Sequence, residues 1–412
     1  MPILFLLYVV AYLDRINVGF GILQMRSQLG LSDRVYGRAA GIFFAGYFLF
    51  QLPSNLALER FGVRRWISGL MLVWGVISCL MILVRGPLSF YGLRFLLGAA
   101  EAGFFPGMIL YMKTWFPSAA RARAVAWFMT ANPIAGMIGS PLSGSLLGIH
   151  GAGFAGWQWM FLIEGVPAIM LGLAVFWALP EHPEQADWLG PAQLVWLTQK
   201  LRAERESASG LPESAVSGEK VWRAILSPKI WLLSVVYFGV AATMYGVTLW
   251  LPSVIHSLAG LGYFWTGMVA ALPFTVTAVV MVWVGVRSDR TGERRWHTAI
   301  PAFLGAAALA VAGFGHSPWV VVAGIGLGLV GAEAMVGPFW AMATAAMTGM
   351  SAAAGIAVIN SLGNLGGYFG PDIVGFFRSS DGSFRGGLLA IAGAVVISGF
   401  SALIVSRGQD RE

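Results

Sequence analysis

The sequence predicts an all-α membrane protein with about twelve transmembrane helices in two related six-helix halves. Of its 412 residues, 57% are hydrophobic and 11% are charged, and the mean hydropathy is +0.74. A chain of this composition cannot cover its surface with polar groups, so most of that surface must face lipid. Long apolar runs also follow one another with short polar breaks, and a motif of the first half recurs in the second.

Each apolar run is close to the length of about 20 residues that a helix needs to cross a bilayer. We expect these helices at residues 1–25, 36–58, 66–85, 88–113, 121–148, 157–180, 228–256, 263–287, 296–314, 318–346, 351–377 and 384–406. Barrel strands would be shorter and would alternate apolar with polar residues. The first run carries Asp14 and Arg15 in its middle and lacks a small-residue cleavage site, so we expect a retained helix and not a signal peptide. The chain begins almost within this run, which leaves a longer N-terminus open.

The net charge of +7 is distributed unevenly over the loops. Arginines cluster in the loops after the even-numbered helices, at Arg60, Arg64, Arg65, Arg121, Arg123, Arg287, Arg290, Arg294 and Arg295. The opposite loops carry fewer, chiefly Arg26, Arg34, Arg38, Arg85, Arg378 and Arg385. This positive-inside pattern predicts a multi-pass protein of a bacterial inner membrane with both termini in the cytoplasm. It accounts for the net charge without nucleic acid as a partner.

One loop, at residues 181–227, has the mixed charges of a soluble segment. It separates an N-terminal six-helix half at 1–180 from a C-terminal half at 228–412. Its stretch P-A-Q-L-V-W-L-T-Q-K-L-R-A-E-R-E at 191–206 has a helical pattern. We expect this helix to lie on the cytoplasmic membrane surface and to tether the halves, with a regulatory role as the alternative.

The two halves repeat a loop motif, L-E-R-F-G-V-R-R at 58–65 and S-D-R-T-G-E-R-R at 288–295. The matched positions are Glu59, Arg60, Gly62 and Arg64 in the first loop and Asp289, Arg290, Gly292 and Arg294 in the second. Glycine permits a tight turn between helices, and the acid can pair with an arginine or a helix end in one gating state only. We therefore expect a conformational latch, and duplicated halves that meet at a central cavity are a transporter architecture.

Ionisable side chains at membrane depth cost about 2.5 to 3.5 kcal/mol each on insertion scales, so each needs a reason. Asp14 and Arg15 lie midway along the first helix, Arg94 and Glu101 lie two turns apart on the fourth, and Glu333 takes the matching place in the tenth. A buried arginine offers a planar fork to a substrate carboxylate, and a carboxyl group beside it would carry a coupled proton. The alternative is that the four side chains of the first and fourth helices neutralise one another and clamp those helices together.

Two carboxyl groups are harder to place. A carboxylate at Glu333 would repel an anion in the same cavity unless it is protonated, so a second titratable site and a helix-packing role both stay open. We expect Glu164 to be structural, bonded to backbone near the bend at Gly165–Pro167. Polar candidates for the remaining cavity lining are Tyr12, Tyr47, Asn132, Tyr245, Trp340, Asn360 and Asn364.

The sequence lacks the residues that metal binding, disulfide formation, catalysis or ATP hydrolysis would need. The lone Cys79 has no partner for a disulfide or a thiolate metal site, and the five histidines show neither ligand spacing nor a catalytic triad. No phosphate-binding loop of the type G-x-x-x-x-G-K-[ST] is present, so we expect no ATP drive, cofactor, metal or enzymatic activity. The glycine-rich stretch G-M-I-G-S-P-L-S-G at 136–144 predicts close helix packing, and it also resembles a motif of exporters.

The chain resembles the major facilitator superfamily over essentially its whole length, and within it the anion:cation symporters that include tartrate, phthalate, hexuronate and galactonate permeases. The resemblance rests on Y-L-D-R-I-N-V-G-F at 12–20, Q-L-P-S-N at 51–55, both loop motifs, A-E-A-G-F-F-P at 100–106, W-F-P-S-A-A-R-A-R-A at 115–124, G-P-F-W at 337–340 and A-A-A-G-I-A-V-I-N-S-L-G-N-L-G-G at 352–367. Glu59 and Glu333 depart from the pattern, which more often has Asp and a neutral residue at these positions. The second departure leaves the charge of the substrate open.

The resemblance implies proton-coupled uptake of a small organic anion by alternating access, in the twelve-helix fold of that superfamily. It implies proton handling by Asp14 and Glu101, a substrate carboxylate near Arg15 and Arg94, and a site lined by Tyr12, Tyr47, Asn132 and Asn364. The partners are then the organic anion, protons and lipid. We expect a monomer, because the two halves already enclose a pathway.

Two other functions remain as alternatives. An exporter or antiporter of amphipathic compounds is favoured by the glycine-rich stretch and the many aromatic residues. A membrane sensor that signals through residues 181–227 is disfavoured, because that loop is too short for a domain-sized core. The sequence does not identify the transported acid.

Overall fold

The computed structural model describes residues 1–186, 188–209, 227–347 and 352–407. Part of the predicted linker, at 210–226, lies outside the described residues. The helices are α1 (Pro2–Ile16), α2 (Val18–Leu29), α3 (Asp33–Phe61), α4 (Val63–Leu80), α5 (Pro87–Glu101), α6 (Phe104–Trp115), α7 (Ser118–Met129), α8 (Ala131–Leu146), α9 (Gly156–Ala178), α10 (Pro191–Ser209), α12 (Pro228–Ala259), α13 (Tyr263–Thr291), α14 (Arg295–Phe314), α15 (Pro318–Ala334), α16 (Val336–Ala345), α17 (Ala352–Asp381) and α18 (Arg385–Arg407), with short 3-10 turns at Met81–Leu83 and Pro183–Gln185.

Within the described ranges, ten segments are long and apolar enough to cross a bilayer. Two other spans were predicted, and they contain more polar residues. One corresponds to α7 together with α8, and the other corresponds to α17. Four predicted spans are interrupted, between α1 and α2, α5 and α6, α7 and α8, and α15 and α16. In three of them a proline, Pro106, Pro133 or Pro338, stands just after the interruption. Proline has no N–H for the carbonyl four residues earlier, so the helix ladder is broken there.

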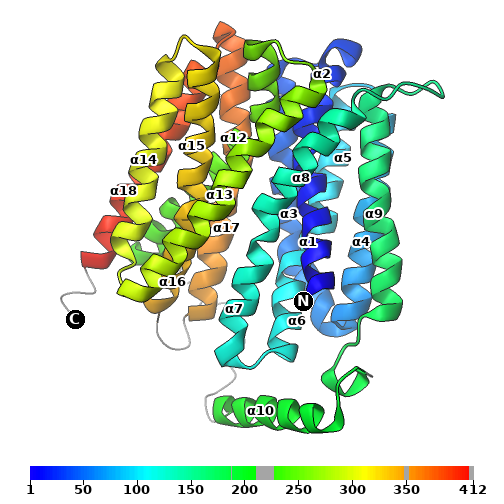
Figure 1. Ribbon diagram of the computed structural model, residues 1–412, viewed down its shortest axis with the longest axis vertical. Coiled ribbons are helices and arrows are strands. Elements are labelled where there is room, and N and C mark those ends of the chain that lie inside the picture. Colours follow the sequence, from blue (N-terminus) through cyan, green and yellow to red (C-terminus); the bar gives the residue numbers. More distant parts are fainter. Residues whose placement is uncertain (187, 210–226, 348–351, 408–412) are drawn as a thin grey trace.

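The helices form two groups that stand side by side, α1–α9 in one and α12–α18 in the other, and α10 lies across one end (Figure 1). We call the end with α10 the linker end, and the turns at Gly62 and Gly292 also belong to it. We call the other end, where α2 and α12 finish at Gly30 and Gly260, the far end. The start of α1 and the end of α18 lie in the part of the molecule nearer the linker end (Figure 1).

Glycines bring the two groups together at the far end. A Cβ atom on Gly41 of α3 would lie 2.4 Å from the carbonyl oxygen of Tyr368 on α17. On the other side of the molecule, a Cβ on Gly267 of α13 would lie 2.3 Å from the carbonyl oxygen of Ser140 on α8. Backbones can approach this closely only where no side chain intervenes, and such contacts are typical of helix packing in membranes. The predicted packing role of the glycine-rich stretch at 136–144 agrees with these contacts.

Candidate functional site

Between the two groups of helices lies a cavity of about 90 Å³, which is partly open to the surroundings. Its polar lining residues are Tyr8, Arg15, Tyr47, Asn132, Tyr237, Tyr245, Glu333, Asn360 and Asn364, and its apolar ones are Phe44, Phe105, Met129, Val240, Ala241, Met244 and Val336. These residues lie near the middle of their spans or toward the linker end. Since glycine contacts close the far end, the cavity extends from mid-span toward the linker end.

Arg15 is the cation of this cavity. Its side chain projects from the last turn of α1, and the residue is 8% exposed. Its Nε donates to Oε2 of Glu101 at 2.6 Å, and its Nη1 lies 3.4 Å from the hydroxyl of Tyr245. Its guanidinium carbon lies 5.2 Å from the centre of the Tyr47 ring, a cation–π contact. Its Nη2 has no hydrogen-bond partner within the described residues, so part of the fork is left for a ligand.

Arg94, Asp14 and Glu101 do not line the cavity, although all three were expected there with Arg15. Of the three, only Glu101 is bonded to Arg15. Arg94 is 1% exposed, its guanidinium lies 4.9 Å from the centre of the Phe43 ring, and its Nε is 3.5 Å from the carbonyl oxygen of Ala39. Asp14 projects about 100° around the helix from Arg15, toward Ser78 of α4 and not toward the cavity. Within the described residues, Arg15 and Glu101 are therefore the only ion pair of that predicted group of four.

Tyr12 and Trp340 were also predicted for the lining and lie outside it. Tyr12 lies about one turn before Arg15 on α1, and its side chain is 1% exposed within the helix packing. Trp340 packs against Tyr237 and Phe339, with ring centres 5.1 and 5.2 Å apart. Tyr237 lines the cavity and Trp340 does not, so the indole contacts the wall through the Tyr237 ring.

The second group of helices supplies one carboxyl group and two amides to the cavity. Glu333, at the end of α15, is 4% exposed, and the amide nitrogen of Asn132 lies 3.4 Å from its Oε1. No cation pairs with Glu333 among the described residues. Asn364 donates to Asn360 at 3.2 Å, one turn apart on α17. The cavity thus has a cation on one side and a carboxyl group with amides on the other.

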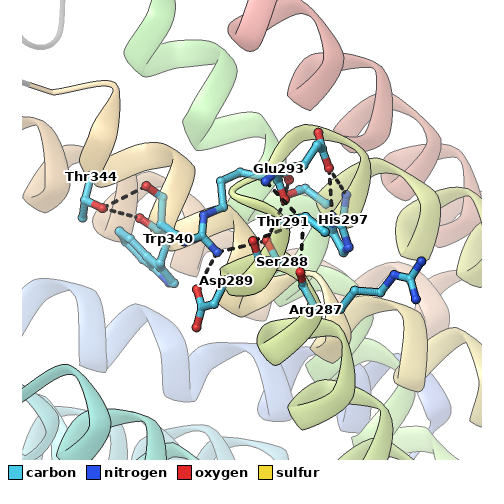
Figure 2. Close-up of polar contacts among 11 residues, drawn as sticks. Arg287, Ser288, Asp289, Thr291, Glu293, His297, Trp340 and Thr344 are labelled. Atoms are coloured by element: carbon cyan, nitrogen blue, oxygen red, sulfur yellow. Dashed lines mark hydrogen bonds and ion pairs between the residues drawn. The ribbon is translucent and has the colours of Figure 1, made fainter.

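The repeated loops differ from each other in their ion pairs. In the second loop, Arg294 donates to Asp289 at 2.6 Å and to the hydroxyl of Ser288 at 3.0 Å (Figure 2). In the first loop no ion pair is recorded for Glu59 among the described residues, and Glu59 and Arg60 are exposed. Both loops turn at a glycine with positive φ, 82° at Gly62 and 69° at Gly292, as expected.

Glu293 closes the second loop onto α14. It accepts hydrogen bonds from the backbone N–H groups of Trp296 and His297 and contacts Nδ1 of His297 at 2.8 Å (Figure 2). Partial burial acts to raise the pKa of Glu293, but these hydrogen bonds outweigh it and lower the pKa below its ordinary value. The ionised carboxylate therefore caps the N-terminus of α14.

Sequence reasoning missed the aromatic and aliphatic part of the wall. Tyr8 and Tyr237 line the cavity, although neither was predicted to do so. A signal existed, since Tyr8 precedes Arg15 by two helical turns and Tyr237 precedes Tyr245 by about the same distance, which places each pair on one face. The apolar members carry no such signal. No group of three or more metal-ligating side chains occurs in the parts of the chain that the structure describes.

Comparisons with known proteins now identify the family. Residues 4–371 match the Major Facilitator Superfamily. The chain is 45% identical over 412 residues to a putative tartrate transporter of Agrobacterium vitis, covering 100% of this chain and 90% of that one. It is 39% identical over 389 residues to a quinolone resistance transporter of Acinetobacter baumannii, covering 94% and 88%.

Among solved structures, a bacterial homologue of the human lysosomal transporter Spinster, in an inward-facing and unoccupied conformation, has a TM-score of 0.79 at 18% identity, covering 98% of this chain and 96% of that one. The fold and the family resemblance predicted from the sequence are therefore confirmed. The chain belongs to the Major Facilitator Superfamily, and it is a multi-pass membrane transporter and not an enzyme.

Proposed function

We propose that this protein takes up a small organic anion, such as tartrate or a sugar acid, together with protons by alternating access. The observation that carries the proposal is the Arg15–Glu101 ion pair at the wall of the cavity, with part of the guanidinium unused. The 45% identity to a putative tartrate transporter supports the substrate class. At about 90 Å³ the cavity is smaller than the pockets of about 300–1,000 Å³ that hold drug-sized ligands, which favours a compact acid over an extended amphipath.

The ion pair supplies a reason for coupling. While Glu101 is ionised, it occupies Nε of Arg15 and neutralises the guanidinium. A proton on Glu101 removes that competition, so the fork can hold a substrate carboxylate. When the proton leaves, the ion pair forms again and the anion is displaced. Proton and anion therefore bind together and leave together.

The other polar side chains fit hydroxyl groups and a second site of proton binding. Asn132, Asn360 and Asn364 can hydrogen-bond the hydroxyls of a sugar acid or tartrate from the opposite wall. Glu333 has no cation beside it among the described residues, so we assign it a titratable role in preference to helix packing. It must be neutral while an anion occupies the same cavity, since like charges repel in a low dielectric.

The membrane sidedness completes the proposal. With the arginine-rich loops in the cytoplasm, both termini and the linker end face the cytoplasm of a bacterial inner membrane. The described conformation is then open toward the cytoplasm and closed at the far end. Arg94 and Asp14 lie behind the residues that line the cavity, so they act on transport without contacting the substrate. The protein acts as a monomer with halves at 1–180 and 228–412.

Uptake into proteoliposomes tests this function. An inward proton gradient should drive accumulation of L-tartrate or a sugar acid, and a protonophore should abolish it. Arg15→Lys keeps the charge but loses the planar fork, so uptake should fall on the order of 10- to 100-fold, the worth of a charge-assisted hydrogen bond of about 1.5–3 kcal/mol. Arg85→Lys, in an exposed loop, is the matched control and should transport normally. The proposal fails if no acid in the panel accumulates.

A second candidate, export of amphipathic compounds, is favoured by the 39% identity to a quinolone resistance transporter and by the aromatic wall. Tyr8, Phe44, Phe105 and Tyr237 present ring surfaces to the cavity. If this candidate holds, expression should raise the tolerance of a pump-deficient bacterium to quinolones, and vesicles should show no acid uptake.

A further inference from the structure

A second buried polar cluster lies on the side of α1 that faces away from the cavity. Asp14 and Asn17 belong to it, three residues apart and therefore on one face of the helix. Both are completely buried, and neither lines the cavity. The mechanism above does not assign a partner to either of them.

Asp14 is held by α4. The hydroxyl of Ser78 donates to its Oδ1 at 2.9 Å, and the indole of Trp74 faces the same carboxyl group. Its other oxygen, Oδ2, is buried and has no hydrogen-bond partner within the described residues. No cation forms an ion pair with Asp14 in these ranges.

Glu164 is held in the same way between α9 and α8. It is 2% exposed, and the hydroxyl of Ser143 donates to its Oε1 at 2.6 Å. Its Oε2 is buried and unpartnered within the described residues. The amide of Asn17 faces this carboxyl group, although neither amide atom reaches hydrogen-bond geometry with any described residue. A fully buried amide with both polar atoms unsatisfied marks a place where a further donor or proton is missing.

The packing of α4 on α9 brings the two carboxyl groups into one region. A Cβ on Gly165, next to Glu164, would lie 2.9 Å from Sγ of Cys79, which follows the Ser78 that holds Asp14. The ionisable groups around them are Glu101 and Arg94 from α5, Cys79 from α4 and Glu164 itself from α9, and α8 contributes no ionisable side chain. Arg94 stacks on Phe43 and forms no ion pair with either carboxylate in the described chain. Two unpaired carboxylates in so low a dielectric cannot both stay ionised.

The donors around the carboxyl groups indicate a proton in preference to a metal ion. A cation site would need oxygen lone pairs that converge on it. Here both serine hydroxyls direct their hydrogens at carboxylate oxygens, and an indole N–H, which cannot ligate a metal, faces Asp14. A proton needs only one of the two free oxygens, Oδ2 or Oε2.

We infer that Asp14 and Glu164 share one proton in a site behind α1, with Asn17 between them as a positioning residue. This inference rests on the proposed proton coupling and adds Glu164 and Asn17 to it. The site and the cavity are on different faces of one helix, because Arg15 follows Asp14 directly and projects about 100° from it. Loss of the shared proton would make the two carboxylates repel each other, shift α1 against α4 and α9, and so move Arg15.

Infrared difference spectroscopy tests the shared proton without any substrate. The purified full chain is titrated between alkaline and acidic pH, and the carbonyl stretch of protonated carboxyl groups is followed. Asp14→Asn and Glu164→Gln should each remove the same one-proton signal, because the remaining carboxylate loses its like-charged neighbour and can ionise with its serine donor. The double variant should lose no more than either single one. Glu59→Gln, at the exposed end of α3, should leave that one-proton signal unchanged.

Additive losses in the double variant, or an unchanged signal in Glu164→Gln, would overturn the inference. A signal that Na⁺ removes in a saturable way, with choline as the control ion, would replace the proton by a metal cation and overturn it as well. Ser143→Ala is a milder variant that leaves both carboxyl groups in place, and it should shift the pH at which the signal titrates. Because no anion is added, a normal one-proton signal without L-tartrate uptake would reject the proposed substrate alone.

Discussion

The far end and the linker end of the molecule are held in different ways. At the far end the two groups of helices touch backbone to backbone at glycines, and ion pairs join Asp33 of α3 to Arg378 of α17 and Arg38 to Asp372. At the linker end the ion pairs described stay within one group, as in Arg294 with Asp289, or join it to α10. The far end therefore carries the contacts that must break before the cavity can open on that side.

Adding a side chain between α3 and α17 is expected to have the largest effect on closure of the far end. Gly41→Leu places atoms where the Tyr368 carbonyl oxygen now lies, 2.4 Å from the first added carbon. Overpacking of this kind costs about 1–3 kcal/mol, so closure at the far end should weaken on the order of 5- to 150-fold. Thr248 is a buried residue of α12, one turn from Tyr245 on the side of the far end. The measurement is the rate at which an impermeant maleimide labels Thr248→Cys in a Cys79→Ser background, and that rate should rise.

The control for Gly41→Leu is Gly285→Leu, on α13, where an added Cβ meets nothing within 4 Å. It adds the same side chain at a position that no neighbouring helix contacts, so it should leave the labelling rate unchanged. Equal labelling of the two variants would show that close packing of α3 on α17 does not hold the far end shut.

A smaller effect is expected from the ion pairs at the same end. Asp33 contacts both Arg26 and Arg378, and all three side chains are partly buried. Asp33→Asn should weaken far-end closure by about 1 kcal/mol, or roughly fivefold, because partly exposed pairs contribute little more than that. The same labelling assay measures it. Asp372→Asn, whose Arg38 partner is 43% exposed at 3.8 Å, should change the rate less.

Asp33 also stands in the first turn of α3, where a negative charge favours the helix terminus. Arg378→Gln breaks the same inter-group contact without touching that terminus. If Asp33→Asn accelerates labelling and Arg378→Gln does not, the effect belongs to the helix end and the ion pair is not a far-end contact of consequence.

The sequence predicted the spanning helices well but not the places where they are interrupted. The spanning helices were found within a few residues, because each must carry an apolar run long enough for the bilayer. The four interruptions were not predicted, although three prolines mark them. A proline near the start of a helical segment is compatible with a continuous pattern of apolar residues, so hydropathy alone does not reveal the break.

The cavity was predictable only in part. Arg15, Tyr47, Asn132, Tyr245, Glu333, Asn360 and Asn364 were all predicted and all line one cavity, while their roles stay predictions. Asp14, Arg94, Tyr12 and Trp340 were placed with them but point elsewhere. The part of α1 from Val10 to Ile16 is buried on every side, so it has no polar face from which the sequence could fix its rotation. Only the packing of neighbouring helices, chiefly α8 and α9, decides which side chain meets the cavity.

The smallest effect is expected at the linker end, where α10 is attached by one carboxylate. Glu204 accepts hydrogen bonds from the backbone N–H of Ser118 at 3.0 Å and from its hydroxyl at 2.8 Å, so a side chain of α10 caps the start of α7. These hydrogen bonds from Ser118 hold the pKa of Glu204 below its ordinary value. The attachment is therefore complete above the usual carboxyl pKa and is lost as the pH falls through the lowered one.

Glu204→Gln removes this charge, and we expect faster amide hydrogen exchange in α10 with no change in far-end labelling. In the unmodified protein, acidification through the lowered pKa of Glu204 should produce the same faster exchange. Glu184→Gln, another exposed carboxylate of the linker, is the control and should exchange as before. If far-end labelling changed together with α10 exchange in Glu204→Gln, the linker would couple the two ends, and the separation between a tightly joined far end and an independently held linker end would have to be abandoned.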